Sequence, residues 1–186
     1  MMNKEESYHA FEILYWCGIR LGELLALTAE KKTLRINKSY QRIKGKDVIT
    51  TPKARKSNRV LTLPDFLADE MQDYISRLPY LKIDDRIFTI TKSGLHHEMD
   101  RGCRETGVKR IRIHDLRHSH VSMLIEMGFS AVDIANRVGH ESVKVTYRYA
   151  HMFPNKDLMI AKKLNISRNG VKDEQEESRS ERTFEK

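Results

Sequence analysis

The stretch His114-Asp115-Leu116-Arg117-His118, followed by Gly139-His140 and then Tyr149, decides how this chain is interpreted. It places imidazoles, a guanidinium and a phenol at spacings that helices can bring together. His114 and Arg117 are three residues apart, so on a helix they share one face. A guanidinium matches two phosphate oxygens with parallel hydrogen bonds. In a basic protein, this combination indicates chemistry on a phosphodiester.

Composition favours one domain with an anionic partner. The chain has 186 residues, with 34 Lys and Arg against 26 Asp and Glu, a net charge of +8. That charge favours nucleic acid or a membrane surface as the partner. The sequence contains no apolar run long enough to cross a bilayer, and it starts without a hydrophobic signal region. We therefore expect a cytoplasmic protein in which Cys17 and Cys103 are reduced thiols.

The first half of the chain predicts helices around a small sheet. Alternating and β-rich stretches at 34–37, 48–51 and 60–63, with Gly45 in a turn, predict three antiparallel strands. Apolar periodicity predicts helices at 8–16, 21–27 and from Pro64-Asp65 to Arg77, a short extended piece at 86–88 and a turn at 91–94.

The second half is predicted to be mostly helical, which makes the fold class α+β. Helices are expected at 116–127, at 131–138 with Ser130 as N-cap and Gly139 as stop, from Ser142 past Tyr149, and at 155–164. Residues 167–186 are charged and nearly devoid of apolar side chains, so a disordered tail is expected there.

Two alternative interpretations compete with phosphodiester chemistry, and a third alternative concerns which phenol is the functional one. His114, His118 and His120 could form a metal cluster, but the chain lacks a zincin-type glutamate and a further ligand pair; His118 and His120 are more simply structural. Ser130 to Tyr149 resembles a helix-turn-helix, which would make the chain a DNA-binding regulator without catalysis. Tyr147 competes with Tyr149 as the functional phenol.

Several motifs, taken in order, resemble the catalytic domain of tyrosine recombinases, most closely the phage and conjugative-transposon integrases of Gram-positive bacteria. Arg20 lies in a Gly-Ile-Arg-Leu-Gly-Glu segment that resembles the first motif of the family. The basic segment 51–59 resembles its β-hairpin, and His114 to His118 its second motif. Val138-Gly139-His140 and the segment starting at Tyr149 complete the resemblance, which spans about Phe11 to Leu164.

The resemblance implies a set of site residues and a reaction. The implied catalytic residues are Arg20, Lys53, His114, Arg117, His140 and the nucleophile Tyr149, with Glu23 orienting Arg20 or His114. Tyr149 would attack the scissile phosphate and form a 3′-phosphotyrosine, with His114 as general base and Lys53 protonating the 5′-oxygen. No metal or nucleotide cofactor is implied. A type IB topoisomerase shares this chemistry, but the chain's small size and its hairpin favour a recombinase.

The resemblance also implies domains and partners. Residues 1–166 are expected to be the catalytic domain and 167–186 the tail, without the arm-binding and core-binding domains that precede the first motif in relatives. The implied partners are double-stranded DNA at attachment sites and further copies in a synaptic tetramer, in which the 155–164 segment docks in cis or in trans. The basic side chains expected to contact DNA phosphates are Arg35, Lys38, Arg42, Lys44, Lys46, Arg55 and Lys56.

Overall fold

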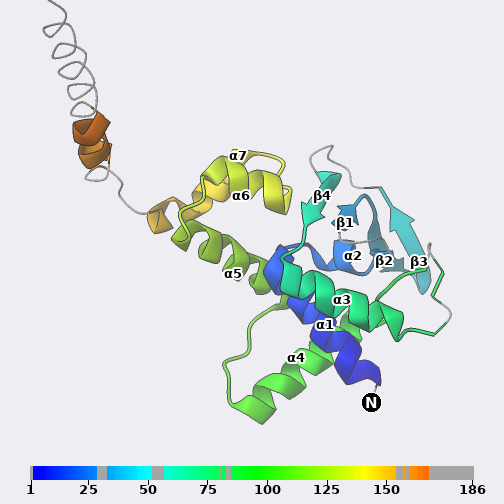
Figure 1. Ribbon diagram of the computed structural model, residues 1–186. Helices are drawn as coiled ribbons and strands as arrows, with labels where there is room; N and C mark the ends of the chain where they lie inside the picture. The colour runs from blue at the N-terminus through cyan, green and yellow to red at the C-terminus, as the bar shows by residue number, and fades with distance from the viewer. Residues whose placement is uncertain are drawn as a thin grey trace, which may run out of the picture. The chain divides into compact units, whose positions relative to one another are not determined.

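A computed structural model shows a mainly helical molecule with short strands in its first third (Figure 1). It describes residues 2–28, 33–51, 57–79, 81–82, 85–153, 157 and 160–167. The contacts divide the chain into one unit of Met1–Met152 and a second of Phe153–Lys186. The expected α+β class is confirmed, and everything that positions the candidate site belongs to the first unit.

Helix α1 (Met2–Cys17) forms the centre of the first unit. It contacts helices α2 (Leu21–Leu24), α3 (Asp65–Ser76), α4 (Lys92–Thr106) and α5 (Ile113–Glu126). Its residues Ala10, Ile13, Leu14 and Cys17 are almost fully buried. Each large apolar side chain buried in this way stabilises the fold by about 1.5–3 kcal/mol. Burial also raises the pKa of the Cys17 thiol to about 12, so Cys17 is an inert thiol of the core, as expected.

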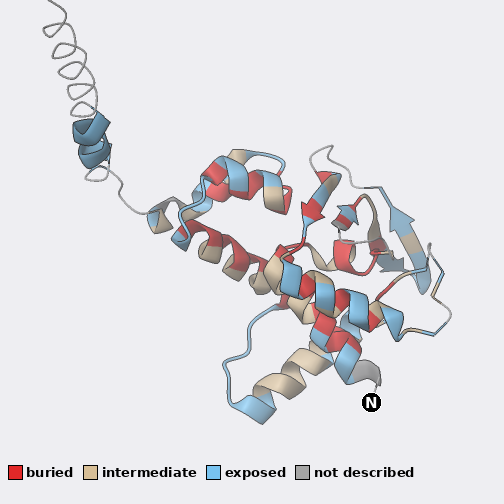
Figure 2. Ribbon diagram, viewed as in Figure 1, coloured by how far each residue is buried: buried red, intermediate tan, exposed pale blue. Residues whose placement is uncertain are grey.

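The strands differ from the sequence prediction of one three-stranded sheet. Among the described residues, β1 (Thr33–Ile36) pairs with β4 (Arg59–Thr62), and β2 (Ser39–Ile43) pairs with β3 (Lys46–Thr50), in two separate antiparallel ladders. The sequence prediction missed β2 because only Tyr40 in it is buried, so the strand lacks an alternating apolar face. Figure 2 shows that β3 is also largely exposed. Lys44 and Gly45, both with positive φ, make the tight turn of this hairpin.

The segment after the strands returns to the core. Helix α3 begins after Pro64 and ends one residue short of its predicted end at Arg77. The predicted extended piece at 86–88 is confirmed by a bridge between Thr28 and Arg86. The prediction of a turn at 91–94 was wrong, because this segment begins helix α4. Thr91 is the N-cap of α4, and its hydroxyl accepts a hydrogen bond from the backbone N–H of Gly94.

The last helices of the first unit follow the sequence prediction closely. Helix α5 begins at Ile113, so His114 lies in its first turn. Helix α6 (Ala131–Val138) has Ser130 as N-cap and Gly139, in a left-handed conformation, as C-cap. Helix α7 (Val143–Thr146) is short and continues as a 3-10 helix, η2 (Tyr147–Met152), which is kinked at Tyr149. Helix α5 contacts both α6 and η2.

In the second unit, residues 160–167 are helical, within and just beyond the range where the final amphipathic helix was expected. The charged tail beyond residue 167 lies outside the described residues. Among the described residues, none of the helices has the length and apolar character that crossing a membrane requires.

Candidate active site

Five of the six expected catalytic residues line one pocket. Its volume is about 190 Å³, and its walls come from the start of α2, from α5, from the turn after α6, and from α7 and η2. The lining residues are Arg20, His114, Arg117, His118, Val121, His140, Val145, Arg148 and Tyr149. The sixth expected residue, Lys53, lies outside the described residues, as do Arg55 and Lys56.

Arg117 is held inside the pocket wall. Its side chain is buried, and its Nη1 donates a hydrogen bond of 2.6 Å to the backbone oxygen of Gly18. Gly18 has a φ of +61°, and a Cβ there would come within 2.4 Å of the His120 ring, so the turn requires glycine. Nη2 of Arg117 is buried and has no hydrogen-bond partner among the described residues. The guanidinium thus has a donor free for an anionic oxygen.

Arg117 remains positively charged at neutral pH although its side chain is buried. Burial and the neighbouring Arg20 lower the pKa of Arg117 to about 9. The guanidinium is therefore still protonated at neutral pH, but its charge is poorly compensated. A phosphate in the pocket would supply the missing negative charge.

Of the two partners predicted for Glu23, Arg20 and His114, the structure shows contacts with Arg20. Glu23 occupies the third position of α2, and its Oε2 accepts a hydrogen bond of 2.9 Å from the backbone N–H of Arg20. Its Oε1 accepts a bond of 2.8 Å from Nη1 of Arg20. Nη2 of Arg20 donates to the backbone oxygen of Gly139 at 3.1 Å. The Arg20 side chain is nevertheless 40% exposed, so it can reach a ligand.

Arg59 completes this network, and the sequence analysis did not single it out. It donates to both oxygens of Glu23, at 3.3 and 3.1 Å, and from Nε to the backbone oxygen of Arg137 at 2.9 Å. Burial disfavours the Glu23 carboxylate, but the bonds and charges of Arg59 and Arg20 outweigh burial and lower its pKa. The signal for Arg59 was the alternation of β4, which places it on the same face as buried Leu61.

His140 is a neutral hydrogen-bonding group. It is buried, and its Nδ1 lies 2.8 Å from Oγ1 of fully buried Thr146. Burial, together with the charges of Arg117 and Arg20, lowers the pKa of His140 to about 4. When the Thr146 hydroxyl donates to Nδ1, Nε2 carries the proton and can donate to a ligand in the pocket.

Tyr149 places its hydroxyl inside the pocket, whereas Tyr147 is 57% exposed and does not line it. The kink at Tyr149, with φ −96° and ψ 15°, lies within the sterically restricted bridge region. The Tyr149 hydroxyl is hydrogen-bonded to Nδ1 of His118. Burial raises the pKa of the Tyr149 phenol. Of the two candidate tyrosines, Tyr149 alone lies with the other expected residues.

The histidines of α5 take three different positions. The His114 ring lies edge-on to the His118 ring, with centroids 4.9 Å apart. His118, expected to be structural, instead lines the pocket. The signal for it was its spacing of four residues from His114, which puts both rings on one helix face. His120 is buried against Gly18 on the core side of the helix. Within the described ranges, no group of three or more metal-ligating side chains is found.

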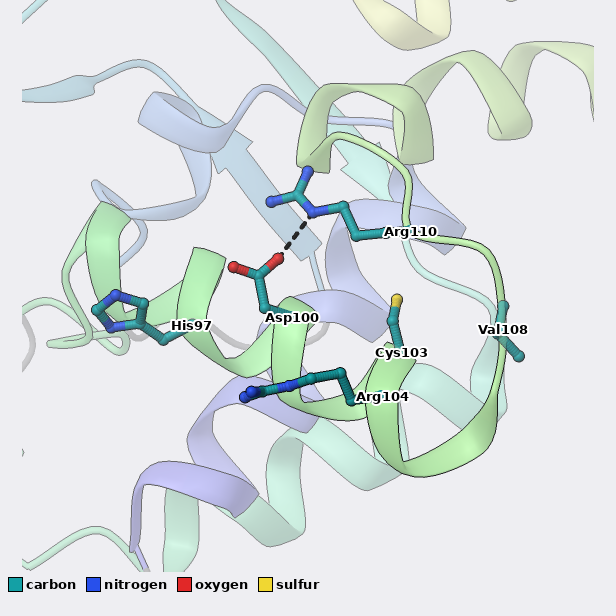
Figure 3. A pocket seen from close by; sticks show the side chains of 6 residues that line it. All are labelled: His97, Asp100, Cys103, Arg104, Val108 and Arg110. Atoms are coloured by element: carbon teal, nitrogen blue, oxygen red, sulfur yellow. Dashed lines mark hydrogen bonds and ion pairs between the residues drawn. The ribbon is translucent and has the colours of Figure 1, made fainter.

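A second pocket, of about 560 Å³, lies beside α4 and shares no residue with the first. Figure 3 shows Arg110 reaching from the loop after α4 to Asp100, whose oxygen lies 2.8 Å from Nε of Arg110. The remaining labelled residues, His97, Cys103, Arg104 and Val108, lie along α4 and the loop that follows it. Of the basic groups in this second pocket, Arg110 is therefore already paired with a carboxylate.

Comparison with known proteins identifies the family. The profile described as the phage integrase family matches residues 2–156, which is most of the chain. The chain belongs to the phage integrase family. The match starts before Arg20 and ends after Tyr149, so it contains every expected site residue.

Proteins with sequences related to this chain include one bacterial integrase and one phage integrase. The ICEBs1 integrase of Bacillus subtilis is 32% identical, over 83% of this chain and 47% of its own length. The integrase of Staphylococcus phage L54a is 29% identical, over 83% of this chain and 50% of its own length. The chain thus spans about half the length of the curated relatives it matches.

Solved integrase structures share the fold. The Tn1549 transposon integrase, in a complex with a circular intermediate DNA, has a TM-score of 0.66 and 17% identity, covering 87% of this chain and 58% of that one. The catalytic domain of bacteriophage HP1 integrase has a TM-score of 0.57 and 21% identity, covering 84% of this chain and 80% of that one.

Proposed function

We propose that the chain is the catalytic domain of a site-specific recombinase, which cleaves and rejoins DNA strands through a 3′-phosphotyrosine during integration or excision of a mobile element. One observation carries the proposal. Arg20, Arg117, His140 and Tyr149 come from three distant segments and line one pocket of about 190 Å³, large enough for a single phosphate. Family membership supports the same chemistry.

Each group of the pocket has a task in this reaction. The Tyr149 oxygen attacks phosphorus and forms the phosphotyrosine bond as the bond from phosphorus to the 5′-oxygen breaks. Arg117 and Arg20 offer paired N–H donors to the non-bridging oxygens, where negative charge develops. Neutral His140 donates one more hydrogen bond. Lys53 delivers a proton to the departing 5′-oxygen, the role that the family resemblance suggests for it.

The proposed partners follow from the same reaction. The substrate is double-stranded DNA at attachment sites, which the solved relatives bound to DNA support. Further copies of the chain assemble on that DNA as a synaptic tetramer, in the cytoplasm of a bacterial host. Residues 1–166 act as the catalytic domain, 167–186 as the tail, and the 155–164 segment docks on its own or on a neighbouring copy.

A helix-turn-helix regulator has weaker support. Helix α7 spans only Val143–Thr146, about one turn, which is too short to serve as a recognition helix in a DNA groove. The glycine turn before it presents the Gly139 oxygen to Arg20 and places His140 at the pocket. A regulator also offers no reason for the buried, partly unpaired Arg117.

The test is covalent capture on DNA. A nicked suicide substrate, from which the short 5′-hydroxyl fragment diffuses away, should trap the chain in a covalent complex. Peptide mapping should place the attached nucleotide on Tyr149. Failure of the wild-type chain to form any covalent complex, on a substrate that it binds, would overturn the proposed function.

A further inference from the structure

We propose that His118, rather than His114, accepts the proton of the Tyr149 phenol as the phosphotyrosine bond forms. This inference rests on the proposed function. It changes the role that the family resemblance implies for His114, and it assigns a catalytic role to a residue that no comparison assigns.

The geometry singles out His118. Its Nδ1 is the atom hydrogen-bonded to the Tyr149 hydroxyl, and the two ring centroids are 5.9 Å apart. Both side chains are half-buried, and both line the pocket that contains Arg20 and Arg117. His114 also lines the pocket, but its ring contact is with the edge of His118. His118 therefore stands between His114 and the nucleophile.

The chemistry of the phenol requires such a neighbour. An unperturbed tyrosine has a pKa near 10, and burial raises the pKa of Tyr149 further. The nucleophile is thus almost fully protonated at neutral pH and needs a base in direct contact. For Nδ1 of His118 to accept that proton, the ring proton must be on Nε2.

The step balances without another reactant. The Tyr149 oxygen bonds to phosphorus, the bond to the 5′-oxygen breaks, and the phenolic proton moves to Nδ1 of His118. The 5′-oxygen takes its proton from a separate acid. In the reverse step the 5′-hydroxyl attacks the phosphotyrosine, and protonated His118 returns its proton to Tyr149.

Charged and titratable groups from all neighbouring elements surround His118. Asp115, whose pKa is lowered first by Arg112 and also by His118, is the acidic group nearby on the same helix. Cationic groups around the pocket outnumber this carboxylate, and a phosphate bound there would add negative charge beside His118. The other groups that line the pocket are His114 and Arg117 from α5, Arg20 from the start of α2, His140 from the turn after α6, and Arg148 and Tyr149 from η2.

The decisive variant is His118→Asn. The asparagine Oδ1 stands at the position of Nδ1 and can still accept the Tyr149 hydrogen bond, but it cannot take up a proton. Single-turnover cleavage of the suicide substrate should slow by about 100-fold or more, the usual contribution of a general base. DNA affinity should stay unchanged. His97→Asn, which changes an exposed histidine of α4, is the matched control.

Replacing Tyr149 with a fluorinated tyrosine separates a base from a merely structural residue. A more acidic phenol needs less help from a base, so the deficit of His118→Asn should shrink by about tenfold. The deficit of His114→Asn should not change. Cleavage by His118→Asn at the wild-type rate would overturn the inference. So would a cleavage deficit of His118→Asn that is the same with fluorinated and ordinary tyrosine, or a deficit that shrinks on fluorination only in His114→Asn. In each case the wild-type adduct on Tyr149 would leave the proposed function standing.

Discussion

At the scale of single residues, Arg117 combines burial, charge and an unsatisfied donor. Its Nη1 donates a hydrogen bond to the Gly18 carbonyl, and its Nη2 is buried without a hydrogen-bond partner among the described residues. An unpaired buried donor on a cation is costly, so a protein retains one chiefly where a ligand pairs with it. This supports the proposed role of Arg117, which is to stabilise the negative charge that develops during strand cleavage.

Arg117→Lys should damage cleavage nearly as much as Arg117→Ala. Lysine keeps a charge but cannot hold Gly18 and present a planar fork to two phosphate oxygens. Both variants should lower the single-turnover cleavage rate by about 100- to 1000-fold, with a much smaller effect on DNA affinity. Cleavage and filter-binding assays on one nicked substrate separate the two effects. A lysine variant that cleaves at the wild-type rate contradicts this role.

Tyr149→Phe should abolish the covalent complex and leave non-covalent DNA binding nearly intact. The change removes only one hydroxyl, which is the proposed nucleophile. Tyr147→Phe is the matched control, because Tyr147 is exposed and outside the pocket. Denaturing gels that separate free from DNA-linked protein give the readout. Loss of the adduct in Tyr147→Phe with its retention in Tyr149→Phe would reverse the assignment.

At the scale of elements, the turn after α6 couples the helix end to the site. Gly139 has a φ of +70°, and a Cβ there would lie 2.6 Å from Nη1 of Arg59. The same turn presents its carbonyl to Arg20 and places His140 in the pocket. The left-handed conformation and the close approach of Arg59 both exclude a side chain.

Gly139→Ala should therefore cost more than the backbone penalty alone. Gly128→Ala is the control, since Gly128 has a φ of +87° and open space at the Cβ position. The control should lose about 1–2 kcal/mol of unfolding free energy, the cost of a left-handed alanine. Gly139→Ala should lose clearly more and should also reduce covalent capture, because Arg59 must move from Glu23. Urea unfolding measures the loss of unfolding free energy, and the suicide substrate measures covalent capture. Equal losses of unfolding free energy in Gly139→Ala and Gly128→Ala would rule out the Arg59 contact.

Arg59 connects β4, α2 and the end of α6 through one guanidinium. Its side chain is 8% exposed and that of Glu23 is 3% exposed. Arg59→Met should destabilise the fold by about 3–5 kcal/mol, since it leaves a buried carboxylate with less compensation. Adding Glu23→Gln should recover part of the unfolding free energy but not the cleavage rate, because Arg20 then loses its orienting carboxylate. Additive losses of stability in the double variant would contradict this coupling.

At the scale of the whole molecule, the buried histidines His9, His120 and His140 make stability depend on pH, because burial lowers the pKa of each. Burial lowers the pKa of both His120 and His140 from 6.5 to about 4. Between those values the unfolded chain binds more protons than the folded chain. Their contribution to stability is therefore fully present above pH 6.5 and is lost as the pH falls toward 4, by up to roughly 3 kcal/mol for each group.

Urea unfolding at neutral pH and near pH 5 should show this loss. His120→Leu should reduce the pH dependence, because one of the buried histidines with a strongly lowered pKa no longer titrates. His97→Leu, at an exposed position, should leave it unchanged. An unaltered pH dependence in His120→Leu would show that His120 is not the titrating group. Activity is not needed for this measurement, so it is independent of the proposed function.

The sequence by itself determined the α+β class, the boundaries of α6 and five of the nine residues that line the candidate pocket. These depend on local signals: helix caps at Ser130 and Gly139, apolar periodicity, and short motifs in a fixed order. Such signals act over a few residues, so they can be read without knowing the fold. The pairing of strands was missed because β2 and β3 carry few buried side chains and so give no alternating pattern.

Tertiary structure alone decided which of these residues touch. Arg59 meets Glu23 across 36 residues of sequence, and His118 meets Tyr149 across 31. Neither contact is visible in local patterns, because each depends on how β4 and η2 pack against helices from distant parts of the chain. The choice of Tyr149 over Tyr147 has the same origin: both phenols belong to one 3-10 helix, and only the packing of that helix against α5 turns one hydroxyl into the pocket.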